Sequence, residues 1–84
     1  MNLRDLKYLI AVTKEQHFAR AAEKSFVSQP TLSMQIKKLE KELGVQIFER
    51  SNKNFLVTKV SKEIIKKAEI ILREAEEIKN FYFN

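Results

Sequence analysis

The sequence predicts a mainly α fold, a winged helix-turn-helix of three helices and a two-stranded wing, followed by a long dimerisation linker helix. Three observations lead to this fold. Apolar residues recur at three- and four-residue steps through most of the chain, which is typical of amphipathic helices. That period is interrupted after Gly44 by two short β-prone runs. One Gly, one Pro and no Cys among 84 residues exclude a turn-rich sandwich and a disulfide framework.

The first two helices are predicted from apolar spacing and a capping signal. Asn2 is a good N-cap, and Asp5 three residues later favours the positive end of a helix. The positions that mark this helix are the apolar Leu3, Leu6, Leu9 and Ile10, followed by Thr13. A second, short helix is expected around residues 18–22, and a tight connection over residues 24–27 follows it. His17, the only histidine, is expected to start or pack that helix rather than bind a metal.

The third helix is predicted to open at Ser28, whose hydroxyl can cap it. Pro30 falls in the first turn, where its missing N–H costs nothing. One apolar stripe then follows at spacings of four, three and four: Leu32, Ile36, Leu39 and Leu43. Gly44 lies where a helix end needs a left-handed residue.

A hairpin with a basic tip is predicted after Gly44. Its strands are the β-prone runs 45–48 and 55–57, and Arg50 and Lys53 lie in the polar segment between them. An isolated hairpin is marginally stable, so it is expected to pack on the helices. Thr58 can then cap the last helix. We therefore expect a winged helix-turn-helix domain over residues 1–58, with the helix-turn-helix at about 18–43 and the wing at about 45–57.

The last helix, over residues 59–84, is predicted to join two copies of the chain. The residues of one face of this helix recur at steps of three and four over about three heptads, which is typical of a helix that pairs with another. The alternative is that this stripe folds back on its own domain. The candidate dimerisation residues, called the pairing seam below, are Ile64, Ala68, Ile71, Leu72, Ala75 and Ile78.

Charge is unevenly distributed. The chain has 16 Lys+Arg and 11 Asp+Glu, and because residues 61–84 carry five of each sign, the net charge of +5 belongs to residues 1–60. A compact basic domain can bind a polyanion, although the same charge could serve only solubility. No apolar run approaches the ~20 residues of a membrane span, and no signal peptide is apparent, so a cytoplasmic module without a membrane partner is expected.

The third helix carries the side chains expected to contact DNA. Short hydrogen-bonding residues at its start can reach base edges, and Lys37, Lys38 and Lys41 lie off the apolar stripe, where they can contact phosphates. A basic hairpin beside such a helix can reach the minor groove. The candidate DNA-binding residues are Ser28, Gln29, Pro30, Thr31, Ser33, Met34, Lys37, Arg50 and Lys53.

Each assignment has a structural alternative. Ser28 and Thr31 could serve only to cap the helix, the lysines could form an ordinary charged face, and Arg50 could pair with Glu49 or Glu40. Two rival functions are possible. The chain could be a protein-interaction module that binds an acidic partner, or it could be a plain coiled-coil piece. The polar candidate residues at the start of the third helix argue against the protein-interaction module. A plain coiled-coil piece would leave the first 57 residues unexplained.

No catalytic, metal or cofactor site is expected. The carboxylates are scattered among lysines, and no Ser/His/Asp grouping, Gly-rich loop or paired acid has an enzymatic spacing. The expected partners are double-stranded DNA with dyad-related half-sites and a second copy of the chain.

Several of these motifs together resemble the N-terminal module of LysR-type bacterial transcriptional regulators. The segment Val-Ser-Gln-Pro-Thr-Leu-Ser over residues 27–33, Leu-Gly-Val over 43–45 and Phe-Glu-Arg over 48–50 carry the resemblance. It implies that residues matching Gln29, Pro30, Thr31, Ser33 and the wing Arg50 contact DNA. It also implies an effector-binding domain of two α/β lobes that is absent here, so a fragment is expected.

A finer resemblance concerns the N-terminal helices. Arg-Asp-Leu over residues 4–6, His17-Phe18 and Arg-Ala-Ala over 20–22 look most like the peroxide-responsive OxyR branch of the family. The resemblance implies that the residues that sense peroxide lie outside this chain. It also implies a bacterial protein associated with the nucleoid, with a tetramer as a further state of the full-length protein.

Overall fold

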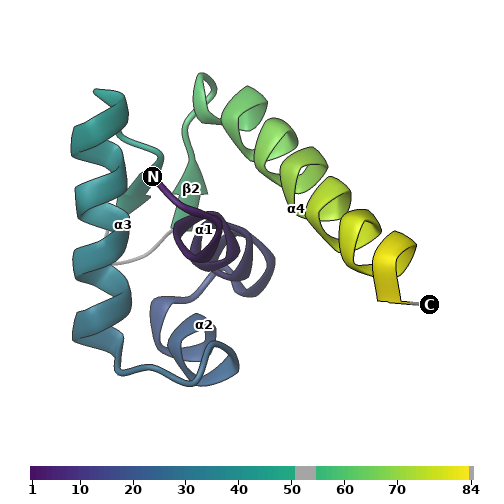
Figure 1. The fold of residues 1–84 in the computed structure, drawn as a ribbon. Coiled ribbons are helices and arrows are strands. Elements are labelled where there is room, and N and C mark those ends of the chain that lie inside the picture. The colour runs from purple at the N-terminus through teal and green to yellow at the C-terminus, as the bar shows by residue number, and fades with distance from the viewer. Residues whose placement is uncertain (51–54, 84) are drawn as a thin grey trace.

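The computed structural model describes residues 1–50 and 55–83. Its elements follow the predicted order of three helices, a hairpin and a long helix: α1 (Leu3–Glu15), α2 (Phe18–Lys24), α3 (Gln29–Leu43), β1 (Phe48–Arg50), β2 (Phe55–Val57) and α4 (Ser61–Phe83). Figure 1 shows α1 in the centre, with α3 on one side, α4 on the other and α2 packed beneath. None of the described helices combines the length and hydropathy that a membrane span requires.

The predicted capping residues of the first two helices are confirmed. Asn2 and Asp5 form a capping box, in which Asn2 Oδ1 accepts from the Asp5 N–H at 2.8 Å and Asp5 Oδ2 accepts from the Asn2 N–H at 3.3 Å. His17 starts α2, because its Nδ1 accepts from the Arg20 N–H at 3.3 Å. The helix-start role expected for the only histidine is therefore what the structure shows.

The apolar stripe of α3 packs into the centre of the domain. Leu32, Ile36 and Leu39 are buried, whereas Leu43 is partly buried at the edge. Ala21 and Ala22 of α2 are buried as well, and their small side chains let α2 approach its neighbours closely. The other buried apolar residues of the core are Leu6, Tyr8, Leu9, Val12, Ile47, Phe48, Ile65 and Ala68.

The wing is an antiparallel pair whose first strand begins later than predicted. Phe48 pairs with Val57 and Arg50 with Phe55. The first strand was expected over residues 45–48, but it starts at Phe48 because the preceding backbone is engaged elsewhere. The Ile47 N–H donates to the Glu40 carboxylate at 2.8 Å, and the Phe48 N–H donates to the same oxygen at 3.3 Å. The N–H of Phe48, the first strand residue, is thus committed to α3.

Aromatic packing also fixes the wing to the helices. Phe48 is fully buried, and its ring meets that of Phe18 edge-on, with centroids 6.0 Å apart and planes at 86°. The expectation that the hairpin packs on the helical body is confirmed by this contact.

Thr58 does not cap α4 in the way its position suggested, because α4 begins three residues later, at Ser61. The Thr58 hydroxyl donates instead to the Gln46 carbonyl at 2.8 Å and lies 2.6 Å from the Ser61 hydroxyl. Ser61 is completely buried and is 3.3 Å from the same carbonyl. The start of α4 is therefore joined to the backbone that leads into the wing.

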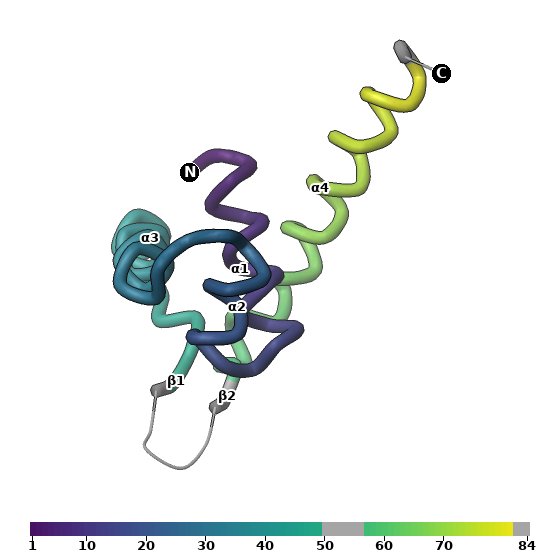
Figure 2. The backbone as a smooth tube through the Cα atoms, turned by 90° about the horizontal axis from the view of Figure 1, so that it is seen from below, coloured from purple at the N-terminus to yellow at the C-terminus, as the bar shows by residue number. Residues whose placement is uncertain are grey.

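The two halves of α4 have different environments. Ile65 and Ala68 in its first half are buried in the core, next to the partly buried Leu72. Ile78 and Phe81 near its end are exposed. Figure 2 shows α4 running away from the other helices toward the C-terminus. The alternative in which this helix packs on its own domain therefore holds for the first half alone.

We predict that Glu40→Ala lowers the free energy of unfolding by about 2 kcal/mol, because two partly buried N–H groups lose their acceptor. Urea unfolding followed by circular dichroism measures the change. Glu69→Ala, at an exposed position of α4, is the control and should unfold like the unchanged chain. Equal stability of all three proteins would show that the Glu40 bonds do not hold the wing to α3.

Candidate nucleic-acid interface

The helix-turn-helix is closed by backbone hydrogen bonds between the end of α2 and the turn. The Ser25 N–H donates to the Ala21 carbonyl at 3.0 Å, and the Val27 N–H donates to the Ala22 carbonyl at 3.0 Å. Phe26 lies between them with φ of +58°, and its side chain is 95% exposed. A left-handed residue is what this tight turn needs, but Phe rarely takes that conformation. No sequence signal indicated it, because Gly and Asn are absent from the turn.

The start of α3 is held by a local network at Ser28. Its Oγ accepts from the Thr31 N–H at 3.2 Å and donates to Thr31 Oγ1 at 2.8 Å. Pro30 occupies the first turn, and Gly44 ends the helix with φ of +71°. The predicted cap at each end of α3 is confirmed. Since the Ser28 hydroxyl is exposed, it remains accessible from solvent while it caps the helix.

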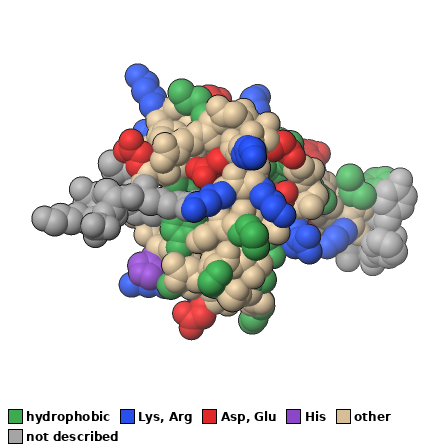
Figure 3. Space-filling view, turned by 90° about the vertical axis from the view of Figure 1, so that its left-hand side faces the viewer, with side chains coloured by type: hydrophobic (Ala, Val, Ile, Leu, Met, Phe, Trp, Pro, Cys, Tyr) green, Lys and Arg blue, Asp and Glu red, His purple; other side chains and the backbone are tan. Residues whose placement is uncertain are grey.

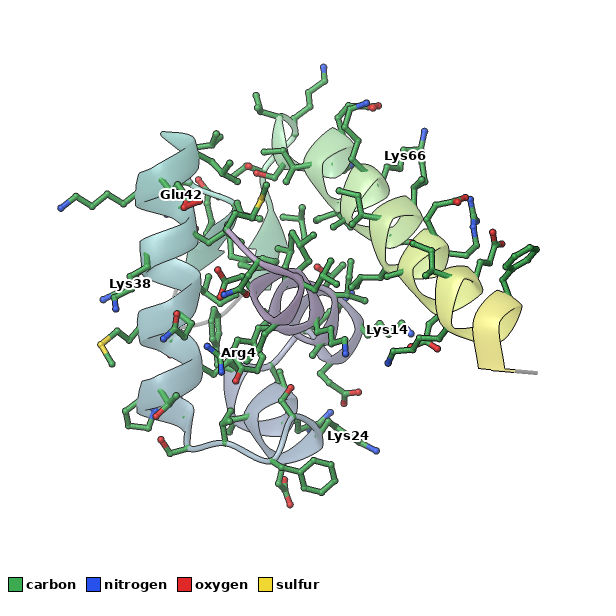
Figure 4. The ribbon with its side chains drawn as sticks, in the orientation of Figure 1. Arg4, Lys14, Lys24, Lys38, Glu42 and Lys66 are labelled. Carbon is green, nitrogen blue, oxygen red and sulfur yellow. The ribbon has the colours of Figure 1, made fainter. Side chains whose placement is uncertain are left out.

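Away from the buried stripe, and at its own first turn, α3 presents an exposed surface that we call the reading face. It consists of Gln29, Pro30, Met34, Lys37, Lys38 and Lys41, all of which are exposed. In Figure 4, Lys38 projects away from the helical body. Figure 3 views the molecule from the side on which α3 lies, and Lys and Arg side chains gather across the middle of this face, with hydrophobic and some acidic side chains around them.

The remaining candidates on α3 flank the reading face. Thr31 and Ser33 are partly buried between it and the core stripe. Their side chains are consequently less accessible than those of Gln29 and Met34. Gln29, Pro30, Met34 and Lys37 are therefore the most accessible of the predicted α3 candidates.

The wing candidates lie at the edge of the described residues. Arg50 is the last residue of β1, at the outer end of the hairpin, and Lys53 lies outside the described residues. Figure 2 shows the two strands projecting from the helical body. The backbone position of Arg50 thus agrees with a place near the hairpin tip, and a contact with DNA stays a prediction.

The residues of the predicted pairing seam differ in exposure, because the fold buries some of them and leaves others on the surface. Ala68 is only 1% exposed because it packs into the core of its own chain, and Ile64, Leu72 and Ala75 are partly buried. Ala68 was expected to face a partner, but the core of its own chain already covers it and leaves almost no surface for one. Ile71 and Ile78 are the exposed members. The heptad pattern missed Ile70 and Phe81, which are also exposed.

The far end of α3 contacts the chain terminus. The Met1 ammonium donates to the Glu42 carboxylate at 2.6 Å, and this hydrogen bond raises the pKa of the amino group above its ordinary value. Figure 4 labels Glu42 near that end of α3. Glu42 is thus paired with the amino terminus. Among the described residues, no group of three or more His, Asp and Glu side chains could hold a metal ion.

Comparison with known sequences relates this chain to one family of bacterial regulatory proteins. Residues 3–61 match the family described as "Bacterial regulatory helix-turn-helix protein, lysR family". Over 79 residues the chain is 48% identical to the DNA-binding transcriptional dual regulator OxyR of Escherichia coli K12, covering 94% of this chain and 26% of that regulator. The chain therefore spans about a quarter of the length of the curated relatives it matches.

Solved structures agree in fold. Full-length OxyR from Pseudomonas aeruginosa superposes with a TM-score of 0.92 at 48% identity, covering 98% of this chain and 28% of that one. The BenM DNA-binding domain, in a crystal structure of its complex with benA site 1 DNA, also gives a TM-score of 0.92, at 36% identity, covering 98% of this chain and 92% of that one. The predicted fold class is confirmed by these similarities.

We predict that two substitutions at Ser28 separate capping from DNA contact. Ser28→Ala removes the acceptor of the Thr31 N–H and should cost about 1 kcal/mol of stability. Ser28→Asp keeps a capping acceptor, so stability should be retained, whereas a carboxylate beside DNA phosphates should weaken binding. Thermal unfolding and a mobility shift measure the two effects. Unchanged DNA affinity in a stable Ser28→Asp protein would leave Ser28 with the capping role alone.

Proposed function

Since the chain belongs to the lysR family of bacterial regulatory helix-turn-helix proteins, we propose that it is the DNA-binding domain of a transcription regulator. It binds double-stranded DNA with sequence specificity and acts as a dimer in the bacterial cytoplasm. The names of its relatives support this role, because the Escherichia coli protein is a DNA-binding transcriptional regulator. So does the BenM domain, which was crystallised in a complex with DNA.

The observation that carries the proposal is the arrangement of side chains on α3. Leu32, Ile36 and Leu39 are buried, so the opposite face of the helix is left to solvent. The exposed surface of α3 begins at the first turn with uncharged Gln29 and Pro30 and continues with lysines. Uncharged side chains at the start of a helix can enter the major groove and contact base edges, and lysines farther along can contact phosphates.

The residues near the start of α3 have distinct proposed roles. Gln29 is exposed and can pair with an adenine edge through its amide. The first N–H groups of α3 form a positive helix end that favours a phosphate. Ser33 and Thr31 contribute through the parts of their side chains that stay accessible. Arg50 and Lys53 belong to the wing and are proposed to meet the adjacent minor groove.

Dimerisation is proposed through the second half of α4. Ile71 and Ile78 are seven residues apart and both exposed, so they lie on one side of the helix where a second copy can pack. Two α3 helices related by a twofold axis would contact half-sites about one helical turn apart, or a multiple of that. The proposed domain bounds stay at 1–58 for the DNA-binding part and 59–84 for the linker helix, whose first half also contributes Ile65 and Ala68 to the core of the DNA-binding part.

The parent regulator is proposed to belong to the peroxide-responsive branch. The identity of 48% over 79 residues to OxyR from Escherichia coli supports this, as does the same identity to a relative named hydrogen peroxide-inducible genes activator. Sensing and any tetramer would depend on residues outside the chain. The chain itself is proposed to supply DNA binding and pairing.

Selection of bound duplexes from a random pool tests the proposed function. We expect an enriched sequence with dyad symmetry. If each subunit neutralises about four phosphates, the slope of log K against log salt should be about −7. The enriched duplex should bind more tightly than a scrambled duplex of equal length. Equal affinity for the two duplexes at physiological salt would contradict sequence-specific binding.

We predict that Arg50→Ala weakens binding to the selected duplex by roughly tenfold, the lower end of the loss for an Arg that contacts bases. Its place at the end of β1 is the reason. A fluorescence titration measures the affinity, and a thermal melt checks that the domain stays folded. Arg73→Ala, in the exposed part of α4, is the control. Wild-type affinity in Arg50→Ala would remove this wing residue from the mechanism.

We predict that Ile71→Glu gives monomers that bind the selected duplex more weakly, because a charge in an apolar helix pair is poorly solvated. Ile71 is 41% exposed in the single chain, so folding should be preserved. The matched control is Ile70→Glu, since Ile70 is similarly exposed, at 47%, but lies outside the pairing seam. Analytical ultracentrifugation measures the oligomeric state. Dimers that persist in Ile71→Glu, or are lost equally in both variants, would contradict pairing through this seam.

A further inference from the structure

The reading face of α3 changes character along its length. Pro30, Met34, Lys37 and Lys41 follow one another at steps of four, three and four, so they form one exposed stripe. The first two members are apolar and the last two are cationic. Met34 is 51% exposed although it is a large apolar residue. The half of the stripe nearest the helix start is therefore an apolar patch bounded by lysines.

The exposure of Met34 is not explained by packing in the core of the domain. It lies two residues from Leu32 and two from Ile36, both of which are buried on the opposite side of the helix. Pro30 is one helical turn before Met34 and is exposed as well, so the two side chains are neighbours on the surface. An exposed pair of this kind is available to a ligand that meets the start of α3.

The chemistry of methionine restricts what Met34 can recognise on DNA. Its thioether has no hydrogen-bond donor and is only a weak acceptor, so it cannot discriminate between the polar edges of guanine, cytosine and adenine. Thymine differs from the other bases because it presents a methyl group in the major groove. A flexible, polarisable side chain is well suited to cover such a group. Apolar contact with thymine is therefore the base recognition open to Met34.

The neighbouring Thr31 fits the same recognition. Its Oγ1 accepts the Ser28 hydroxyl at 2.8 Å, so part of its polar capacity is already used within the helix cap. Thr31 is three residues before Met34 and thus on an adjoining part of the helix surface. The uncharged surface between Met34 and the helix start consequently offers few competing hydrogen bonds, whereas Lys37 and Lys38 bound Met34 on its other side. This arrangement favours a methyl group over a polar base edge.

We propose that Met34, with the Pro30 ring beside it, selects thymine in each half-site by covering its methyl group in the major groove. This inference rests on the proposed DNA-binding function and names the base that one residue of α3 recognises. Lys37 and Lys38 then hold the flanking phosphates, so that specificity at this base comes from apolar contact and affinity comes from charge.

The experiment uses the 84-residue chain and the duplex enriched from the random pool. Each dT is replaced in turn by dU, which removes the methyl group and leaves base pairing intact. We expect one position in each half-site to lose about fourfold in affinity, the factor that burial of a single methyl group confers. A dT in the flanking sequence, outside the bound region, is the control and should show no loss.

Variants at position 34 assign the effect to this side chain. Met34→Ala should bind dT and dU duplexes equally, whereas Met34→Leu, which keeps an apolar side chain, should retain a preference for dT. Both variants should fold normally because the position is half exposed, and thermal melts check this. Specific binding without any loss on dU replacement, or an equal loss in Met34→Ala, would overturn the inference and leave the proposed function standing. Failure to enrich any duplex would overturn both.

Discussion

The burial of one side of α3 is the constraint on which the rest of the structure depends. Leu32, Ile36 and Leu39 are almost completely removed from solvent, and each such side chain contributes about 1.5–3 kcal/mol relative to an exposed one. Rotating the helix to present a different face would expose all of them together. The core therefore sets the rotation of α3 about its axis, and with it the side chains that can meet a groove of DNA.

A polar junction links three parts of the domain that would otherwise be independent. Glu40 of α3 accepts from the N–H groups of Ile47 and Phe48, at the entrance to the wing. The preceding carbonyl, of Gln46, is bound by the Thr58 hydroxyl next to the buried Ser61. Because α3, the wing and the start of α4 share a few adjacent backbone groups, their relative positions are coupled. In the proposed dimer, the position of α4 would therefore be coupled to that of α3 and the wing.

The two halves of the long helix α4 have different environments, although one sequence pattern runs through both. Its first half completes the core with Ile65 and Ala68 and so belongs to the domain. Its second half extends beyond the body, as Figure 2 shows, and carries exposed apolar residues. A single repeat of three and four residues serves both halves, because a helix buries the same stripe whether the surface opposite is its own domain or a second copy.

Local signals in the sequence determined the helices, their caps and the composition of the reading face. Asn2, His17, Ser28 and Gly44 act on backbone groups within a few residues, so their roles could be predicted without knowledge of the fold. The family motif around Gln29 likewise predicted where the candidate interface lies. These features depend on neighbours along the chain, which the sequence displays directly.

Only the tertiary structure decided where β1 begins, which backbone carbonyl accepts from the Thr58 hydroxyl and how the heptads of α4 are shared. Each depends on residues distant in the chain: Glu40 lies seven residues before Ile47, and Ala68 is covered by the core that α1 helps to form. The left-handed Phe26 belongs to the same group, because closure of the turn between two packed helices imposes its conformation. Propensity and periodicity describe what a segment can do alone, whereas the packing of other segments selects among those possibilities.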